Sequence, residues 1–424
     1  MDRQTIPGSN LVPFDFDRDM ESVLRTWSEA GWWDDEDAQK EKISDFFMAN
    51  DGRTVVGLID GSAECVVHRT LGTVRYDQQL LSLGCVSAVT TSRIARRRRL
   101  ASRLTARTVA HLADEGCAVA MLGMFDQGFY DRFGFGTGAY ENHAWIYPGA
   151  LAVPAPYQAP QRFDLDSDSE ELHEAMASRL SVHGGVVVGG ERLTAAGMRV
   201  DDDVSIYGYR TDGQISHFLA VVTTGEHGPD RITQWAYQTP EQCLELLRLV
   251  QEWGDQVDVV RLTEPVWLQL QDFIVDPGAQ LRRTKGSQTG ALRIEADAWW
   301  QARIVDLAAC VEAMGPVDEP FSVVVRIEDP VEPHLVNSGY DGDWNGLDGT
   351  WRLSFGATHT AERISDGEPI DLETTINALT RWWLGVLPAS TLVAMGAFEC
   401  TADTADRMDT LTSHLPKPQP GWDF

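Results

Sequence analysis

CVSAVTTSRIARRRRLASRLTARTVAHLADE, residues 85–115, predicts a strand, a basic turn and an amphipathic helix in succession. Four consecutive arginines at 96–99 form the turn in a chain whose formal net charge is −29. The leucines at 100, 104 and 112 recur with the period of a helix packed on a sheet. The unpaired N–H groups and partial positive charge at a helix start attract phosphates. The stretch therefore predicts an anion-binding turn at the start of a helix over 97–115.

Two further motifs lie outside this stretch. The segment QGFYDRFGFG, residues 127–136, places a tyrosine among three phenylalanines, and residues 421–424 read GWDF. The strand, basic turn and helix resemble the acetyl-CoA pyrophosphate loop of the GNAT acetyltransferases. Together with the tyrosine loop and the acidic-Phe end, they resemble one GNAT branch, the Eis (enhanced intracellular survival) family of actinobacterial N-acetyltransferases. The resemblance extends over essentially the whole sequence.

Composition restricts the class of protein. A length of 424 residues, of which 43% are hydrophobic, suggests two or three domains with a sizeable core. The six cysteines show no paired or metal-binding spacing, which predicts reduced thiols in a cytoplasmic protein. No secretory signal and no apolar run of membrane-spanning length is evident. The acidic balance argues against nucleic acid and anionic membranes as partners. It would suit a cationic substrate, or it only keeps the surface soluble.

The element order predicts an α/β (α+β) chain. Over residues 1–152 we expect strands, the basic turn and its helix, the tyrosine loop and a closing strand through 144–146. This order fits the mixed, splayed sheet of a GNAT module. The proline-rich stretch 148–161 predicts a linker.

Residues 153–290 predict a second α/β unit with a similar element order. Thr239 is expected to cap its last long helix, with Gln242 as the capping-box partner, and no arginine turn precedes that helix. Any cofactor site there would be degenerate. From about residue 291 the pattern changes. The Eis resemblance implies two tandem GNAT-like modules followed by a domain of sterol-carrier-protein fold over 291–424.

The cofactor-binding residues follow from the resemblance. It implies that acetyl-CoA is the acyl donor, with its pyrophosphate held by backbone N–H groups and guanidinium groups of the turn. The expected cofactor-binding residues are Val89, Thr90, Thr91, Arg96, Arg97, Arg98, Arg99, Leu100, Ala101, Ser102, Phe125 and Asp126. Arg99 stands where GNAT chains place a glycine. Either its side chain points outward, or cofactor affinity is weakened.

Acetyl transfer from a thioester to an amine also needs a group that protonates the leaving thiolate and a group that takes a proton from the amine. The resemblance assigns the first role to Tyr130, because a phenol with an ordinary pKa near 10 is protonated at neutral pH. It assigns the second role to the main-chain carboxylate of Phe424. From the residues alone, Tyr130 could equally be a packed core tyrosine, and Phe424 a frayed chain end.

Trp27, Trp32 and Trp33 lie close in sequence to Glu29 and to several aspartates. They form either an aromatic core with a solvated acidic flank or one wall of an acceptor pocket, in which carboxylates and apolar surfaces hold an amine-rich ligand. The resemblance favours the pocket. The expected acceptor-binding residues are Glu29, Trp32, Trp33, Ser87, Ala88 and Asp423.

Two hypotheses follow. The first is an acetyl-CoA-dependent N-acetyltransferase of Eis type, acting on small polycationic acceptors such as aminoglycosides, polyamines or lysine side chains. The second is a catalytically silent acyl-CoA- or lipid-binding scaffold, in which Arg99 has disabled the turn. No metal-binding motif is present, so no metal is expected. The resemblance also implies a homo-oligomer, a hexamer.

Overall fold

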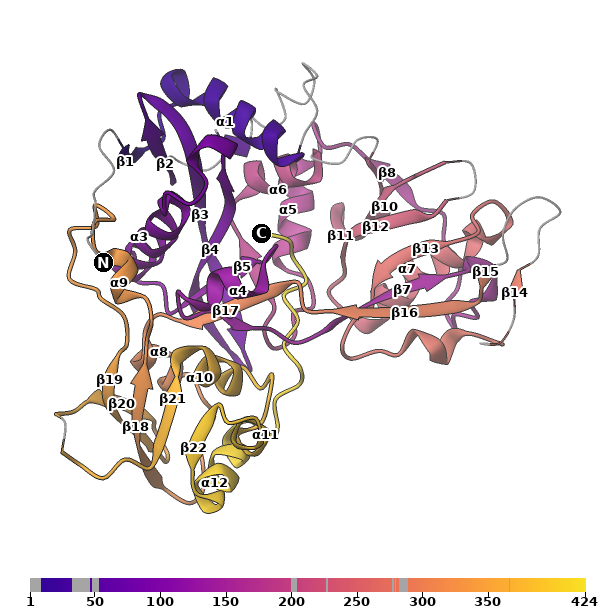
Figure 1. The fold of residues 1–424 in the computed structure, drawn as a ribbon. Coiled ribbons are helices and arrows are strands. Elements are labelled where there is room, and N and C mark those ends of the chain that lie inside the picture. Colours follow the sequence, from indigo (N-terminus) through magenta and orange to yellow (C-terminus); the bar gives the residue numbers. More distant parts are fainter. Residues whose placement is uncertain are drawn as a thin grey trace. The chain divides into compact units, whose positions relative to one another are not determined.

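The computed structural model describes residues 9–32, 46–47, 53–199, 204–225, 228–276, 278, 280–281, 289–365 and 367–424. The chain divides into two compact units (Figure 1). The first unit consists of Met1–Ala139, Val182–Val188 and Ala298–Phe424, and the second consists of Tyr140–Ser181 and Gly189–Asp297. No helix in the described part of the chain is long and apolar enough to cross a membrane.

An eight-stranded sheet forms the centre of the first unit. Its strands are β1 (Ser9–Pro13), β2 (Thr54–Ile59), β3 (Ser62–Tyr76), β4 (Gln79–Thr91), β5 (Val119–Gly123), β6 (Gly136–Thr137), β9 (Val186–Val188) and β17 (Trp300–Ile304). Their order is β1-β2-β3-β4-β5-β17-β6, and β9 pairs with β3. Strands β4 and β5 are parallel, and the other pairs are antiparallel.

Among the residues described between β1 and β6, α-helices accompany this sheet. They are α1 (Phe16–Ala30), α3 (Leu100–Asp114) and α4 (Gln127–Asp131), and the 3-10 turn η1 (Arg93–Ala95) precedes α3. Helix α3 connects the parallel strands β4 and β5 and buries the predicted leucines at 100, 104 and 112. Leu112 packs so closely on the sheet that a Cβ on Gly84 would lie 2.4 Å from its Cδ2. The predicted strand, turn and helix are therefore confirmed, although the helix begins three residues later than expected.

One strand that was predicted for the first sheet belongs to the second sheet. The strand through 144–146, β7 (Glu141–Ile146), pairs with β13 and β16 in the sheet of the second unit. The first sheet instead receives β17, which lies between β5 and β6 and is buried along its whole length. Local patterning predicts that a segment is a strand, but it does not specify which distant strand will be its neighbour.

A seven-stranded sheet forms the second unit. Its order is β16-β7-β13-β12-β11-β10-β8. The strands besides β7 are β8 (Gln161–Phe163), β10 (Val204–Thr211), β11 (Gln214–Val222), β12 (Asp230–Ala236), β13 (Val260–Thr263) and β16 (Leu292–Asp297), with a separate pair β14 (Gln280–Leu281) and β15 (Thr289–Gly290). The helices are α5 (Ser169–Ala177), α6 (Glu191–Arg199) and α7 (Pro240–Gln251), with 3-10 turns η2 (Pro148–Ala150), η3 (Glu252–Asp255) and η4 (Leu270–Phe273). Helix α7 connects β12 to β13, which pair in parallel.

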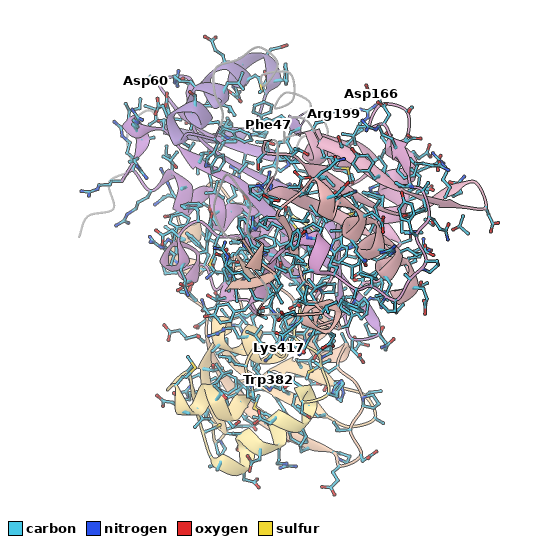
Figure 2. All side chains as sticks on the ribbon, turned by 90° about the vertical axis from the view of Figure 1, so that its right-hand side faces the viewer. Phe47, Asp60, Asp166, Arg199, Trp382 and Lys417 are labelled. Carbon is cyan, nitrogen blue, oxygen red and sulfur yellow. The ribbon has the colours of Figure 1, made fainter. Side chains whose placement is uncertain are left out.

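The C-terminal part of the first unit has its own five-stranded sheet, in the order β20-β19-β18-β21-β22. The strands are β18 (Phe321–Glu328), β19 (Gly349–Phe355), β20 (Thr360–Arg363), β21 (Leu372–Thr375) and β22 (Phe398–Cys400). The helices are α8 (Leu307–Glu312), α9 (Glu332–Leu335), α10 (Ile376–Trp383), α11 (Ala389–Ala394) and α12 (Ala402–Thr412). Trp382 anchors α10 to α12, because its indole N–H donates to the Met408 carbonyl at 3.2 Å (Figure 2).

Candidate active site

The site lies where the two parallel strands of the first sheet separate. Pairing between β4 and β5 runs from Leu83 with Val119 to Val86 with Leu122 and then ends. Just beyond, β4 contains a bulge, and its Ala88 has a left-handed backbone with φ of +52°. A bulge bends the strand that carries it. The continuation of β4 and the segment after β5 therefore become the two walls of an opening.

A pocket of about 860 Å³ occupies this opening. Residues 89–91 of β4 line it on one side, and Phe125 and Asp126 line it on the other. The predicted cofactor-binding residues found in the lining are Val89, Thr90, Thr91, Arg96, Arg97, Arg99, Leu100, Ala101, Ser102, Phe125 and Asp126. Arg98, which is half-buried, is outside that lining. The pocket thus gathers two strand ends and one helix start around a single opening.

The start of α3 contributes free backbone donors to the pocket. Its first helical hydrogen bond runs from the Arg103 N–H to the Arg99 carbonyl at 3.1 Å. The N–H groups of residues 100–102 therefore have no partner within the helix, and all three residues line the pocket. The helix has no side-chain cap and no acidic residue in its first turn. Such a helix start has the donors and the partial charge to bind an anion.

Arg99 occupies the N-cap position of α3 with a left-handed backbone, φ +62° and ψ +18°. Arg97 is also left-handed, with φ of +64°. Glycine adopts this conformation without the steric cost that a Cβ adds. The position where GNAT chains place glycine thus has the backbone that glycine favours, and this chain adopts it with an arginine.

The pocket is cationic in an otherwise acidic protein. Arginines at 93, 96, 97, 99 and 132 line it, and none of them is ion-paired with a carboxylate among the described residues. Both carboxylates in the lining are engaged by backbone groups. The Arg93 N–H donates to Glu29 Oε2 at 2.7 Å, and the Gly128 N–H donates to Asp126 Oδ1 at 3.0 Å. Unpaired guanidinium groups around free backbone donors suit a phosphate-bearing ligand.

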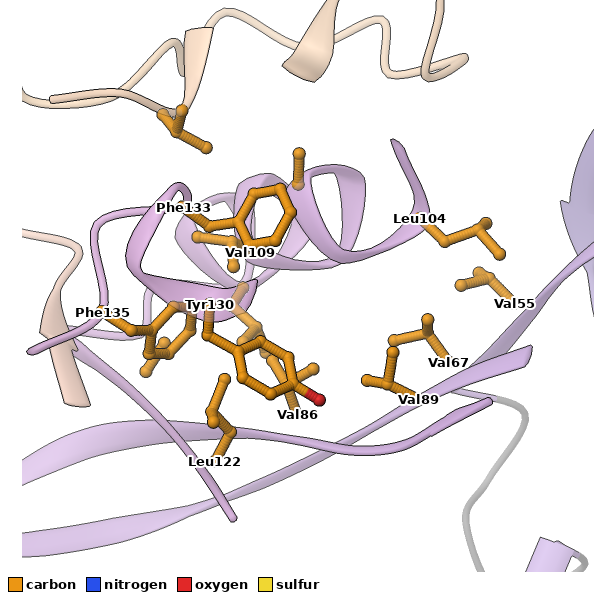
Figure 3. Close-up of a cluster of buried hydrophobic side chains, with 14 of the residues drawn as sticks. Val55, Val67, Val86, Val89, Leu104, Val109, Leu122, Tyr130, Phe133 and Phe135 are labelled. Atoms are coloured by element: carbon orange, nitrogen blue, oxygen red, sulfur yellow. The ribbon is translucent and has the colours of Figure 1, made fainter. Parts of the chain in front are cut away.

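Tyr130 lies in α4, behind the aromatic wall of the pocket. Its side chain is only 2% exposed and is not among the lining residues. Its ring lies 5.6 Å from the Phe125 ring and 4.9 Å from the Phe129 ring, and both of these side chains line the pocket. Figure 3 shows the Tyr130 hydroxyl on the side of Val89, the first pocket residue of β4. Burial raises the pKa of the Tyr130 phenol, and the nearby Asp126 charge adds to the increase.

The chain end packs against the same sheet. The Phe424 ring lies 5.3 Å from the Trp299 ring, and its main-chain oxygen would lie 3.6 Å from a Cβ on Gly123, the last residue of β5. Trp422 is buried, whereas Asp423 is exposed. Phe424 is therefore a packed terminus at the end of β5, next to the segment that forms one wall of the pocket.

The predicted acceptor residues separate into three groups. Glu29 and Trp32 line the pocket. Outside the lining are Ser87 and Ala88, which belong to the bulge of β4, and the exposed Asp423. Trp33 lies outside the described residues. Trp27 instead packs in a core cluster, with its ring 5.1 Å from that of Phe47. Of the neighbouring tryptophans, Trp27 therefore packs in the core and Trp32 lines the pocket.

Several lining residues were missed by sequence reasoning. They are Ala30, Arg93, Ala95, Phe129 and Arg132. Arg132 belongs to the tyrosine loop, where its guanidinium lies 5.0 Å from the centre of the Phe129 ring. The available signal was the Y-x-R spacing of that loop, which places an arginine two residues after Tyr130. Within the described residues, no group of three or more His, Cys, Asp or Glu is placed to hold a metal ion.

Comparisons with known proteins agree with this geometry. Residues 16–138 match the acetyltransferase (GNAT) domain, and residues 315–420 match the sterol carrier protein domain. No curated protein matches the sequence. The matched domains confirm the predicted α/β (α+β) chain with GNAT-like modules and a C-terminal sterol-carrier-protein-like domain.

Solved structures share the fold over nearly the whole chain. A probable N-acyltransferase from Enterococcus faecalis V583 aligns with a TM-score of 0.79 at 16% identity, covering 98% of this chain and 99% of its own. A GCN5-related N-acetyltransferase from Anabaena variabilis gives 0.76 at 14%, covering 98% and 100%. Eis1 from Mycobacterium abscessus gives 0.74 at 17%, covering 98% and 100%. The chain therefore carries a GNAT acetyltransferase domain followed by a sterol carrier protein domain, and it is an enzyme of the acetyltransferase class.

Proposed function

We propose that the protein is an acetyl-CoA-dependent N-acetyltransferase of Eis type, which acetylates an amine of a small polycationic acceptor such as an aminoglycoside, a polyamine or a lysine side chain. The observation that carries the proposal is the uncapped start of α3, whose backbone donors and unpaired arginines open into the gap between β4 and β5. A scaffold that only bound acyl-CoA could use the same gap, but it would need neither a buried phenol nor a packed chain end beside it.

Different residues would bind the different parts of the donor, acetyl-CoA. The N–H groups of residues 100–102 and the arginines at 96, 97 and 99 would bind its pyrophosphate. Main-chain groups of residues 89–91 would pair with its pantetheine arm, while Phe125 closes the other side. Bound acetyl-CoA supplies the thioester whose acyl carbon is attacked.

Two residues would move the protons. The carboxylate of Phe424 accepts a proton from the acceptor ammonium, so that the free amine can form the new C–N bond. As the C–S bond breaks, the Tyr130 phenol donates its proton to the leaving sulfur. The proton that the acylated nitrogen then loses passes through solvent and restores the phenol. Because burial raises the pKa of Tyr130, the phenol remains protonated at neutral and mildly alkaline pH.

The acceptor would lie on the Glu29 and Trp32 side of the pocket, with exposed Asp423 as a further anion for a cationic ligand. We also expect a cytoplasmic hexamer, as in the family that the sequence resembles. Size-exclusion chromatography with light scattering tests the assembly independently of activity.

The first test is turnover. The protein is incubated with acetyl-CoA and a panel of aminoglycosides, polyamines and lysine peptides, and thiol release is followed. We expect release with at least one polycationic amine. No release from any acceptor, together with no CoA binding by calorimetry, would favour the silent scaffold instead.

The second test addresses the chain end and the phenol. Deleting Phe424 or changing Tyr130→Phe should each lower kcat by roughly 10²–10⁴-fold, the usual contribution of general acid–base catalysis, while CoA affinity stays within about twofold. Tyr140→Phe is the control, because Tyr140 is exposed. In the wild type, kcat should not fall with rising pH near the ordinary phenol value of about 10. Unchanged kcat in both variants would remove these groups from the mechanism.

A further inference from the structure

The loop that carries Tyr130 is held by a side chain of the sterol carrier protein domain. The Asn377 side-chain amide donates to the Asp131 carbonyl at 2.8 Å and to the Phe135 carbonyl at 2.7 Å. Both N–H donors of this amide are therefore used by the loop. Asp131 follows Tyr130 in the sequence, and the Phe135 ring lies 6.3 Å from the Tyr130 ring. Asn377 thus holds the backbone that follows Tyr130 at two points.

Two glycines let the loop approach α10 at this point. Gly136 lies so close that a Cβ there would be 2.4 Å from the Asn377 carbonyl oxygen. At Gly134, whose φ is +82°, a Cβ would be 2.7 Å from Ile376 Cγ2. Side chains at these positions would push the loop away from the helix. The FGFG part of the loop motif is therefore suited to contact with α10.

A buried ion pair supports the same loop at Phe133, between the two carbonyls that Asn377 holds. Arg303 and Asp329 are joined at 2.6 Å, and both side chains are fully buried. The other terminal nitrogen of Arg303 donates to the Phe133 carbonyl. Removing either partner would leave an uncompensated buried charge, so a variant here would test folding rather than function. Asn377 is half-buried and offers the cleaner test.

We propose that Asn377 is a positioning residue for acetyl transfer, whose amide holds loop 127–137 so that the Tyr130 hydroxyl faces the opening between β4 and β5. This inference rests on the proposed role of Tyr130 as the general acid. Through this contact helix α10 takes part in catalysis without touching the reactants.

The decisive variant is Asn377→Asp, which keeps the size of the side chain but replaces both N–H donors with a carboxylate facing two carbonyl oxygens. We expect faster hydrogen–deuterium exchange in residues 127–137. We also expect a drop in kcat of about 10-fold with the KM for acetyl-CoA within about twofold, because small misplacement of a catalytic group is costly. Asn377→Ala repeats the test without adding charge. The control is Asn142→Asp in the second unit, where the amide donates to Glu264 Oε2 at 3.1 Å.

A double variant separates this inference from the proposed function. If Asn377 acts through Tyr130, Asn377→Asp should lower kcat further by less than about twofold in a Tyr130→Phe background. An undiminished loss in that background would overturn the positioning role, and so would unchanged exchange in residues 127–137. Failure of the proposed function would appear differently, as a wild type without turnover or a fully active Tyr130→Phe enzyme. Hydrogen–deuterium exchange tests whether Asn377 restrains residues 127–137, whether or not the protein shows turnover.

Discussion

Helices α3 and α7 make the same connection in two different sheets. Each joins two parallel strands, β4 to β5 for α3 and β12 to β13 for α7. The start of α7 is closed by its own side chains. Thr239 Oγ1 accepts the Gln242 N–H at 3.3 Å, Pro240 removes one donor, and Glu241 adds a negative charge to the first turn. The predicted cap is confirmed, although the Gln242 side chain accepts the N–H of Gln238 rather than that of Thr239.

The start of α3 has none of these features. It lacks a side-chain cap, holds Arg99 in a left-handed conformation, and is flanked by arginines. A missing cap costs about 1 kcal/mol, and a left-handed non-glycine residue costs about 1–2 kcal/mol. The comparison shows that α3, unlike α7, leaves the donors of its helix start free for an anion. The start of α3 therefore lowers the stability of the fold, and a bound anion there would restore part of that stability.

The largest expected effect is on CoA affinity, when an acidic residue is placed in the first turn of α3 as in α7. Ala101→Glu places a carboxylate at the second helical position, where α7 has Glu241. A like charge about 4–5 Å from a phosphate costs roughly 3–4 kcal/mol at an effective dielectric constant near 20, so CoA affinity should fall at least 100-fold. Thermal stability should not fall, because an acid in the first turn favours a helix. Calorimetry with CoA measures the affinity.

The matched change in α7, Glu241→Ala, should leave CoA affinity unaltered. An Ala101→Glu protein that binds CoA within threefold of the wild type would show that no phosphate lies at the start of α3.

A smaller effect should distinguish two adjacent arginines. Arg97 lines the pocket, and Arg98 does not. Losing one charge-assisted phosphate contact costs about 1.5 kcal/mol, so Arg97→Ala should weaken CoA binding about 10-fold. Arg98→Ala should weaken it less than twofold, although both variants remove one positive charge. Equal losses in the two titrations would mean that the arginines act only through net charge.

The smallest effect concerns the left-handed cap. Arg99→Gly and Arg99→Ala both remove the guanidinium, but only glycine adopts a φ of +62° without strain. The free energy of unfolding should therefore be about 1 kcal/mol higher for Arg99→Gly than for Arg99→Ala. Urea denaturation of the two proteins measures this difference. Equal midpoints would argue that the turn relaxes to another conformation when the arginine is removed.

Local parts of the fold were predictable from the sequence. The basic turn, the leucine stripe of α3 and the cap of α7 depend on residues a few positions apart, and all three are present. The neighbour of β5 was not predictable, because β17 lies far along the chain and its pattern fits many partners. The same limit explains the misassigned strand β7.

In the candidate site, too, features that depend on nearby residues differ from those that depend on distant parts of the chain. The turn and both strand ends line one pocket, because a single connection brings them together. Arg98 does not line the pocket because the residues on both sides of it, Arg97 and Arg99, have a left-handed backbone. A run of four arginines in the sequence does not reveal these backbone conformations. The glycines at 134 and 136 belong to the tyrosine loop of the sequence. Their close contact with α10 depends on a helix from another domain.

The insertion of β17 between β5 and β6 also affects how the protein is made. At the usual elongation rates of 5–20 residues per second, β17 emerges from the ribosome roughly 10–35 s after β5. Until then one edge of β5 lacks its partner, and unpaired strand edges promote aggregation. A fragment cut near residue 152 would contain the whole basic turn but not the strand that completes its sheet. Expression of the isolated acetyltransferase domain should therefore require residues 300–304 to be grafted onto it.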